Sequence, residues 1–135
     1  MAIFVYPNDR TQYYVKRIIG LPGDRVQLQG TEVILNGKTL TAKRTSNAAG
    51  VEVTETFEGR SWQVRWSQME DTKADSTFIV PSGQVLVLGD YRSATKDSRH
   101  FGSVPLQDVV GRVRQLWFSW GDAGVRWDRL GRLVD

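Results

Sequence analysis

The chain has 135 residues, 40% hydrophobic and 24% charged, which is the composition of one folded domain and excludes a disordered or low-complexity chain. It carries 18 lysine and arginine residues against 15 acidic ones, and this net charge of +3 is too small to indicate a nucleic-acid or lipid partner. No stretch approaches the roughly 20 apolar residues that cross a bilayer. The absence of cysteine excludes disulfides, thiolate metal sites and cysteine nucleophiles.

The first forty residues predict short strands separated by turns. Strands are expected over residues 3–6 and 13–21, because both segments are rich in valine, isoleucine and tyrosine. The second strand ends at a Leu-Pro-Gly-Asp sequence, where proline and glycine suit the two central positions of a turn. An Asn-Gly pair then predicts a hairpin between residues 32–35 and 38–40.

The middle of the chain predicts a second hairpin and two further strands. The alternation of residues 51–57 predicts a strand that turns at Glu-Gly into residues 61–66. Residues 78–81 and 84–88 are expected to be strands on either side of a Pro-Ser-Gly turn. The small, polar stretch 41–50 indicates an exposed loop.

The last third of the chain begins with a polar segment. Residues 89–102 follow neither the helical nor the strand period, so we expect a long ordered loop there. A late strand over 109–120 and a final strand or turn over 125–134 complete the pattern. Since helix signals are weak throughout, the predicted fold class is mainly β, in a single domain over residues 1–135.

One lysine lies on an otherwise apolar strand face. Because side chains alternate along a strand, Tyr14, Lys16 and Ile18 point to the same side. If that side is buried, the pKa of Lys16 falls, and the neutral amine can act as a general base. The alternative is an edge strand from which Lys16 reaches water along its flexible stem. The residues of this strand leave both interpretations open.

A polar segment over residues 89–105 gathers acids, bases and hydroxyls. Within it, Asp97 can form a charge-assisted pair with Arg99 or with Arg92. A network of this kind would order the segment, whereas most charge-rich stretches are solvated loops. Considered alone, this segment favours the solvated loop.

Together, the two segments resemble bacterial signal peptidase I. Residues 16–24, Lys-Arg-Ile-Ile-Gly-Leu-Pro-Gly-Asp, are similar to the lysine box of that family. The residues that resemble its later box are Gly89-Asp90, Arg92, Asp97-Ser98-Arg99, Phe101-Gly102 and Val104-Pro105. The likeness extends over most of the chain. Residues 30–77 resemble the family only in their general β-strand character, and we expect them to be a less family-like β insertion. The resemblance implies antiparallel sheets of the signal peptidase catalytic-core type.

The resemblance also implies an endopeptidase with a Ser–Lys dyad, in which a serine hydroxyl attacks the peptide carbonyl and a neutral lysine accepts its proton. Its position makes Lys16 the base, and Thr95 stands where the family usually has a serine that orients the lysine. The remaining implied roles are a dry lysine pocket of Phe4, Tyr14 and Val87; an Asp97–Arg99 ion pair with Asp90 and Arg92 as further supports; and a substrate-binding strand at Tyr13, Tyr14 and Val15.

Two features depart from the family. It commonly has asparagine where Tyr91 and Ala94 stand. Its nucleophilic serine lies upstream of the lysine box in a Ser-Met-x-Pro-like context, and this sequence contains no Ser-Met pair. We therefore expect a chain truncated at its N-terminus and inactive alone. A recombinant fragment, a mis-started gene and a natural truncated relative would each explain it.

The implied partners are pre-protein signal peptides and a membrane surface, with no nucleic acid, no cofactor and no metal. In the full-length enzyme this domain is expected on the outer side of the bacterial cytoplasmic membrane, and this chain itself is expected to be soluble. The tail over residues 112–132, rich in tryptophan and arginine, suits a membrane interface, although a core with a solvated face explains it equally well.

Three other classes of function compete with this one. A peptide-binding relative without catalysis is the main alternative. A basic β domain that binds single-stranded nucleic acid is supported only by its aromatic and basic residues. A metal enzyme is poorly supported, because His100 is the only histidine and no ligand cluster surrounds it in the sequence.

Overall fold

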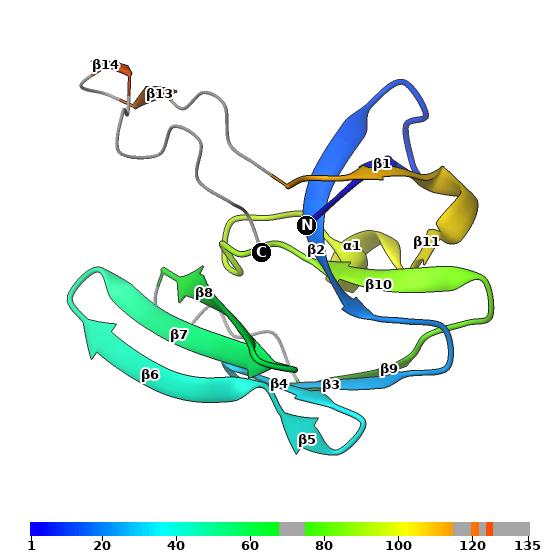
Figure 1. Ribbon diagram of the computed structural model, residues 1–135. Helices are drawn as coiled ribbons and strands as arrows, with labels where there is room; N and C mark the ends of the chain where they lie inside the picture. The colour runs from blue at the N-terminus through cyan, green and yellow to red at the C-terminus, as the bar shows by residue number, and fades with distance from the viewer. Residues whose placement is uncertain (68–74, 115–119, 122–123, 126–135) are drawn as a thin grey trace.

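The computed structural model describes residues 1–67, 75–114, 120–121 and 124–125, which form antiparallel sheets and little helix (Figure 1). The strands are β1 (Ala2–Val5), β2 (Tyr13–Gly20), β3 (Arg25–Gln29), β4 (Glu32–Leu35), β5 (Lys38–Thr39), β6 (Thr41–Asn47), β7 (Gly50–Phe57), β8 (Arg60–Trp66), β9 (Ser76–Ile79), β10 (Gln84–Leu88), β11 (Val104–Pro105), β12 (Val109–Arg112), β13 (Trp120–Gly121) and β14 (Gly124–Val125). The helical segments are α1 (Ser98–Phe101) and a 3-10 turn at Leu106–Asp108. The predicted mainly-β class is confirmed.

The largest sheet has five strands in the order β11-β10-β2-β1-β12. Its central strand, β2, changes partner midway along its length. Residues 13–16 pair with β1, whereas residues 17–20 pair with β10 on the opposite edge. Among the described strands, therefore, the first half of β2 has no partner on the edge that faces away from β1.

A second sheet, in the order β5-β4-β3-β9, follows the turn at residues 21–24. Gly23 in that turn has a φ of 89°, a conformation that glycine adopts without steric cost. Asn36 and Gly37, with φ of 50° and 82°, join β4 to β5 as the two-residue hairpin that the sequence predicts. Both turns thus form where their residue types favour them.

Strand β10 is buried on both faces and joins two apolar clusters. Leu86 and Leu88 pack in the cluster shared with β2, β3 and β4. Val85 and Val87 pack in the other, with Phe4. A strand that is covered on both sides needs a continuous apolar run, and residues 85–88 provide one.

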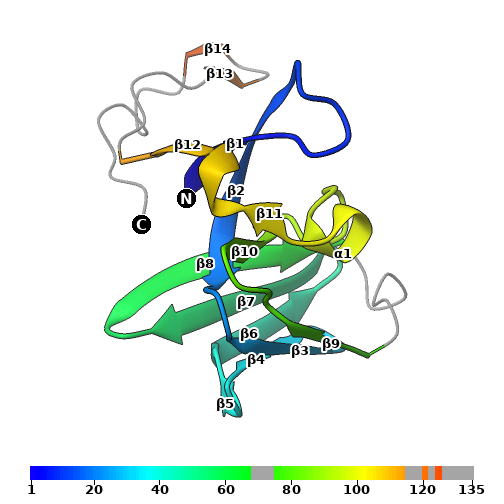
Figure 2. The ribbon, with the colours of Figure 1, turned by 90° about the vertical axis from the view of Figure 1, so that its right-hand side faces the viewer.

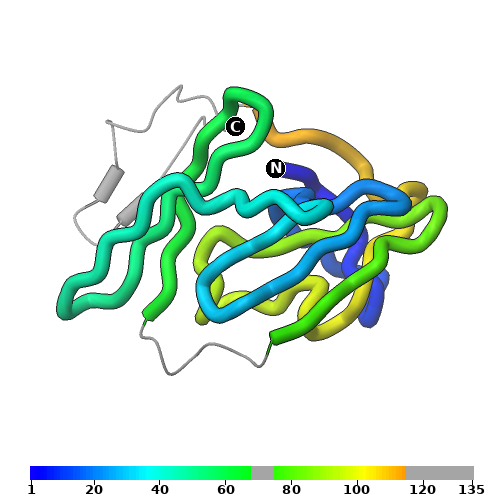
Figure 3. The backbone as a smooth tube through the Cα atoms, turned by 90° about the horizontal axis from the view of Figure 1, so that it is seen from below, coloured from blue at the N-terminus to red at the C-terminus, as the bar shows by residue number. Residues whose placement is uncertain are grey.

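The prediction of a loop over residues 41–50 is wrong. Residues Thr41–Asn47 form β6, the outer strand of a sheet in the order β6-β7-β8. Nearly all side chains of β6 are exposed, so the strand has no apolar face for a sequence pattern to reveal, and its pairing with β7 determines its conformation. The turn between β6 and β7 projects from one end of the molecule (Figures 1 and 3).

The strands at 78–81 and 84–88 are present but are not partners of each other. Strand β9 pairs with β3, and β10 pairs with β2. The segment from 89 to 102 is a loop, as predicted, except for the single turn α1, which lies beside β10 (Figure 2). This loop therefore returns the chain to the five-stranded sheet.

The late strand predicted over 109–120 is shorter than expected, because β12 spans only Val109–Arg112. Residues 115–119 lie outside the described part of the chain, as do most of the predicted final strand over 125–134 and of the tryptophan- and arginine-rich tail. Within the described ranges, no helix has the length and apolarity needed to cross a bilayer.

Candidate active site

Lys16 lies on β2 with its ammonium nitrogen directed at Thr95. The Lys16 Nζ atom is 2.5 Å from Thr95 Oγ1, although the two residues are 79 positions apart in sequence. The side chain is half-buried, and this burial lowers the pKa of Lys16 below its ordinary value of 10.5. Nearby charges act in both directions, because Asp97 and Asp90 raise this pKa while Arg99 lowers it. Burial prevails, so the neutral amine is more populated than in a free lysine.

Thr95 is held against the backbone of Gly89. A Cβ atom added at Gly89 would lie 2.5 Å from Thr95 Oγ1 and still closer to its methyl group. Real Cβ atoms essentially never approach another atom so closely. Glycine at this position therefore allows Thr95 to reach Lys16.

The three predicted pocket residues lie in one apolar cluster. Phe4 and Val87 are fully buried in it, and Tyr14 packs against them. Phe101, which the sequence placed in the later box but not in this pocket, has its ring centroid 6.2 Å from that of Phe4 and 6.4 Å from that of Tyr14. Since the Tyr14 ring centroid is 5.5 Å from Lys16 Nζ, this cluster borders the amine.

Asp97 and Arg99 form a bidentate ion pair. Arg99 Nε and Nη2 each donate to the Asp97 carboxylate at 2.8 Å, and the Gly89 N–H donates to it at 3.0 Å. Burial alone would raise the pKa of this carboxyl, but these hydrogen bonds hold the pKa below its ordinary value of 3.8. Asp97 also caps the first turn of α1. The sequence left Arg99 and Arg92 open as partners of Asp97, and in the structure the partner is Arg99.

Asp90 pairs with Arg17, the residue that follows Lys16. Arg17 Nε and Nη2 both lie 2.9 Å from the Asp90 carboxylate. The Arg17 guanidinium also lies 4.7 Å from the ring centroid of Trp62 on β8. This pair links β2 to the loop that carries Thr95.

Arg92 pairs with a residue that sequence reasoning missed, Glu55 on β7. The two side chains are 1% and 0% exposed and share two hydrogen bonds of 2.7 Å. The Trp62 indole N–H donates a third, also of 2.7 Å, to the same carboxylate. A signal for Glu55 exists in the sequence, because Glu55 continues the inward-facing register of Val51 and Val53.

The predicted substrate strand presents two of its three side chains to solvent. Tyr13 and Val15 are 64% and 43% exposed, whereas Tyr14 is half-buried. Their main chain lies on the half of β2 whose edge away from β1 has no partner among the described strands. Tyr91, where the family commonly has asparagine, is 46% exposed, so its bulk is accommodated at the surface.

Gly89→Ala is expected to destabilise the protein by about 1–3 kcal/mol, because the new methyl group forces Thr95 away from its place. Urea denaturation measures the free energy of unfolding, and NMR of the Lys16 side chain reports loss of the Thr95 contact. Gly111→Ala is the matched control, since a Cβ there has no heavy atom within 4 Å. Equal effects of the two substitutions would contradict the steric explanation.

Comparison with known families defines the class of this protein. The family model described as signal peptidase, peptidase S26, matches residues 1–118. The chain therefore belongs to the signal peptidase family, and the resemblance inferred from its sequence is confirmed. The crystal structure of a signal peptidase I from Enterococcus faecalis V583 is similar, with a TM-score of 0.52 and 26% identity, covering 82% of this chain and 89% of that chain.

Two relatives illustrate the extent of the match. Signal peptidase I from Rickettsia typhi is 31% identical over 134 residues, which cover 88% of this chain and 51% of the relative. Signal peptidase IB from Staphylococcus aureus is 33% identical over 115 residues, which cover 82% of this chain and 56% of the relative. The chain thus spans about half the length of these curated relatives.

Proposed function

We propose that this chain is the lysine-bearing part of an endopeptidase that removes signal peptides from exported pre-proteins. The observation that carries the proposal is the half-buried Lys16, whose Nζ lies 2.5 Å from Thr95 Oγ1 and whose pKa is lowered by burial. A lowered pKa increases the neutral fraction of a lysine, and the neutral amine can serve as a general base.

In the proposed reaction, Lys16 accepts the proton of a serine hydroxyl as that oxygen attacks the carbonyl carbon of the scissile peptide bond. The resulting lysine ammonium then donates this proton to the leaving amine. Asp97 and Asp90 favour the charged lysine electrostatically, so they stabilise the ammonium while it exists. Thr95 orients the amine through its hydroxyl. Burial favours the neutral amine, and the two carboxylates limit the cost of charging it.

Within the described ranges, the hydroxyl hydrogen-bonded to Lys16 Nζ is that of Thr95. Since the chain spans about half the length of its relatives, we propose that a serine outside these 135 residues supplies the nucleophile. We also propose that the assembled enzyme works at the outer face of the bacterial cytoplasmic membrane.

We propose that the substrate adds as a strand to the open edge of β2 at residues 13–15. Main-chain hydrogen bonds to this edge would hold an extended peptide next to Lys16. The exposed side chains of Tyr13 and Val15 would then contact alternate residues of the peptide. Small residues at alternate positions before the cut, as in signal-sequence ends, suit shallow contacts of this kind.

A peptide that ends in Ala-X-Ala is expected to shift the amide NMR signals of Tyr13, Tyr14 and Val15 in the labelled chain. Because main-chain bonds provide the affinity, N-methylation of the peptide backbone should weaken binding by about tenfold per lost bond pair. A peptide with tryptophan in place of both alanines is the control for side-chain size. Shifts confined to another surface, or binding indifferent to N-methylation, would refute strand addition.

A further inference from the structure

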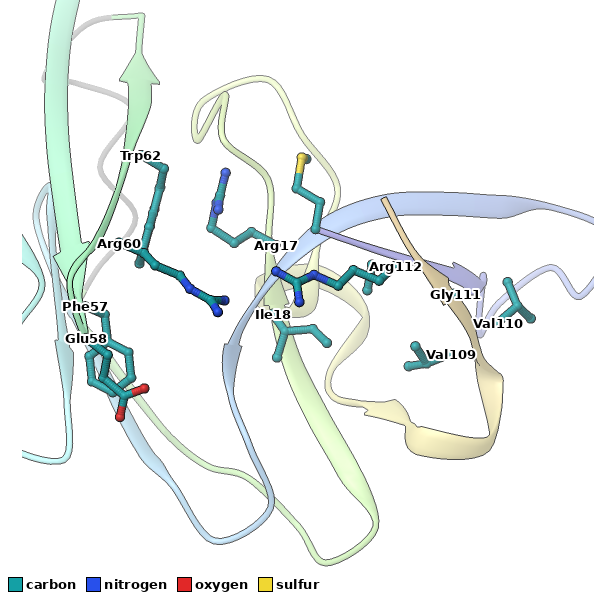
Figure 4. A pocket seen from close by; sticks show the side chains of 12 residues that line it. Arg17, Ile18, Phe57, Glu58, Arg60, Trp62, Val109, Val110, Gly111 and Arg112 are labelled. Carbon is teal, nitrogen blue, oxygen red and sulfur yellow. The ribbon is translucent and has the colours of Figure 1, made fainter. Parts of the chain in front are cut away.

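A pocket of about 620 Å³ opens between the β7–β8 turn and the edge formed by β1 and β12 (Figure 4). Its lining includes Arg17 and Ile18 of β2 but not Lys16, Thr95, Asp97 or Arg99. The pocket is therefore separate from the groups assigned to the proposed peptidase chemistry. Three of its lining residues are arginines.

Two of these arginines reach into the pocket from opposite walls. Figure 4 shows the guanidinium group of Arg60, on β8, directed toward β12, and that of Arg112, on β12, directed toward β8. Neither has an ion pair with any residue in the described parts of the chain. The carboxylate of Glu58 points away from both in the same view. Two like charges converge on one space, and an anion placed there would relieve their repulsion.

The third arginine is already engaged. Arg17 is bound bidentately by Asp90 and lies over the Trp62 ring, so it forms part of the wall. The pocket thus has an excess of positive charge that comes from Arg60 and Arg112. Guanidinium groups are planar forks that match the oxygens of phosphate, which favours a phosphate over a monovalent halide.

The rest of the lining is largely apolar. Phe57 and Trp62 lie on the β7–β8 side, while Ile18 and Val109 lie on the opposite side (Figure 4). A free inorganic phosphate would leave these side chains uncovered. A ligand with a phosphate and an attached hydrocarbon part would satisfy both halves of the lining.

We propose that this pocket binds an anionic phospholipid, with the headgroup phosphate between Arg60 and Arg112 and the first part of an acyl chain against Trp62 and Phe57. The inference depends on the pocket alone and not on the activity of Lys16. Binding of this kind would fix the orientation of the domain at a lipid surface.

The test uses the 135-residue chain, labelled with ¹⁵N and titrated with dihexanoyl phosphatidylglycerol below its micellar concentration. We expect saturable shifts of the Arg60 and Arg112 side-chain signals and of the Trp62 indole signal. Arg60→Gln combined with Arg112→Gln is expected to weaken binding by about tenfold or more, since each charged hydrogen bond contributes substantially. Both side chains are exposed, so the variant should fold.

The matched control is Lys43→Gln combined with Arg44→Gln, which removes the same charge from exposed positions on β6, outside the pocket lining. Unchanged binding by this variant supports the site, whereas an equal loss would overturn it in favour of general charge attraction. Inorganic phosphate that binds as tightly as the lipid would also overturn it, because the apolar side chains of the lining would then contribute nothing to the affinity. Absence of the expected shifts with phosphatidylglycerol overturns it directly.

Discussion

Lys16→Met is expected to reduce signal-peptide cleavage by about 10⁴-fold or more, because it removes the proposed general base and leaves the surrounding apolar cluster in place. The assay needs the whole catalytic unit. A chimera in which this chain replaces the matching half of Rickettsia typhi signal peptidase I provides it, since the two are 31% identical over that part. The rate of pre-protein processing is the measurement.

The same lysine predicts the pH dependence of cleavage. Only the neutral amine accepts a proton, so the rate should rise with pH through the pKa of Lys16, at a pH below the ordinary value of 10.5 because burial lowers this pKa. Thr95→Ala should change the pH at which the cleavage rate rises, because it removes the hydroxyl that orients the amine. Thr95→Ser keeps a hydroxyl and should leave this pH unchanged. A rise at the pKa of a free lysine would contradict the role of burial.

The isolated chain offers a second measurement that does not require the serine. Because the folded state binds the Lys16 proton more weakly than the unfolded state, unfolding takes up protons, and stability should increase as pH rises from the folded pKa toward 10.5. Lys16→Met should abolish this increase. Lys43→Met, at an exposed position on β6, is the control for the cleavage rate and for the pH dependence of stability, and it should change neither.

Cleavage of the pre-protein that survives Lys16→Met would refute the proposed Ser–Lys dyad.

The sequence predicts strands well where one face is apolar and turns are marked by their residues. The hairpin at β4–β5 and the alternating strand β7 both satisfy these conditions. Strand β6 does not, because its exposed polar residues are ordered only by pairing with β7. Which strands are neighbours is also beyond local patterns, as the separation of β9 from β10 shows.

The features of the candidate site also differ in how far the sequence could predict them. Periodicity alone could not decide whether Lys16 is buried, and the structure shows a half-buried residue between the two interpretations. The resemblance to signal peptidase I placed Thr95 near Lys16, and the coordinates bring the two together. The resemblance could not identify Glu55 as the partner of Arg92, because Glu55 lies in the less family-like region. The inward-facing register of β7 indicates that Glu55 is buried, but it does not indicate that its partner lies in the loop at 89–102.

Glu55→Ala is expected to destabilise the protein by about 3–5 kcal/mol, because it leaves the guanidinium of Arg92 buried without a counter-charge. The Trp62 indole N–H loses its acceptor at the same time. This is a large share of the roughly 5–15 kcal/mol by which a domain of this kind is stable. Urea denaturation gives the free energy of unfolding directly.

A control lies on the same strand. Glu52 pairs with Arg65 at 3.0 Å, but the two side chains are 47% and 64% exposed. Glu52→Ala should therefore cost less than about 1 kcal/mol, because water screens the pair and replaces it. Similar costs at Glu52 and Glu55 would show that burial does not determine the strength of this ion pair.

A double substitution separates the pair from the packing around it. Glu55→Leu with Arg92→Leu removes both charges, so its cost should be well below the sum of the single substitutions. The Arg92 carbonyl accepts a hydrogen bond of 2.6 Å from Arg99, and Arg99 holds Asp97. Loss of Glu55 alone should therefore also weaken the Thr95–Lys16 contact, observed as a change in the Lys16 side-chain NMR signal. An unchanged signal would mean that Glu55 stabilises the fold without positioning the lysine.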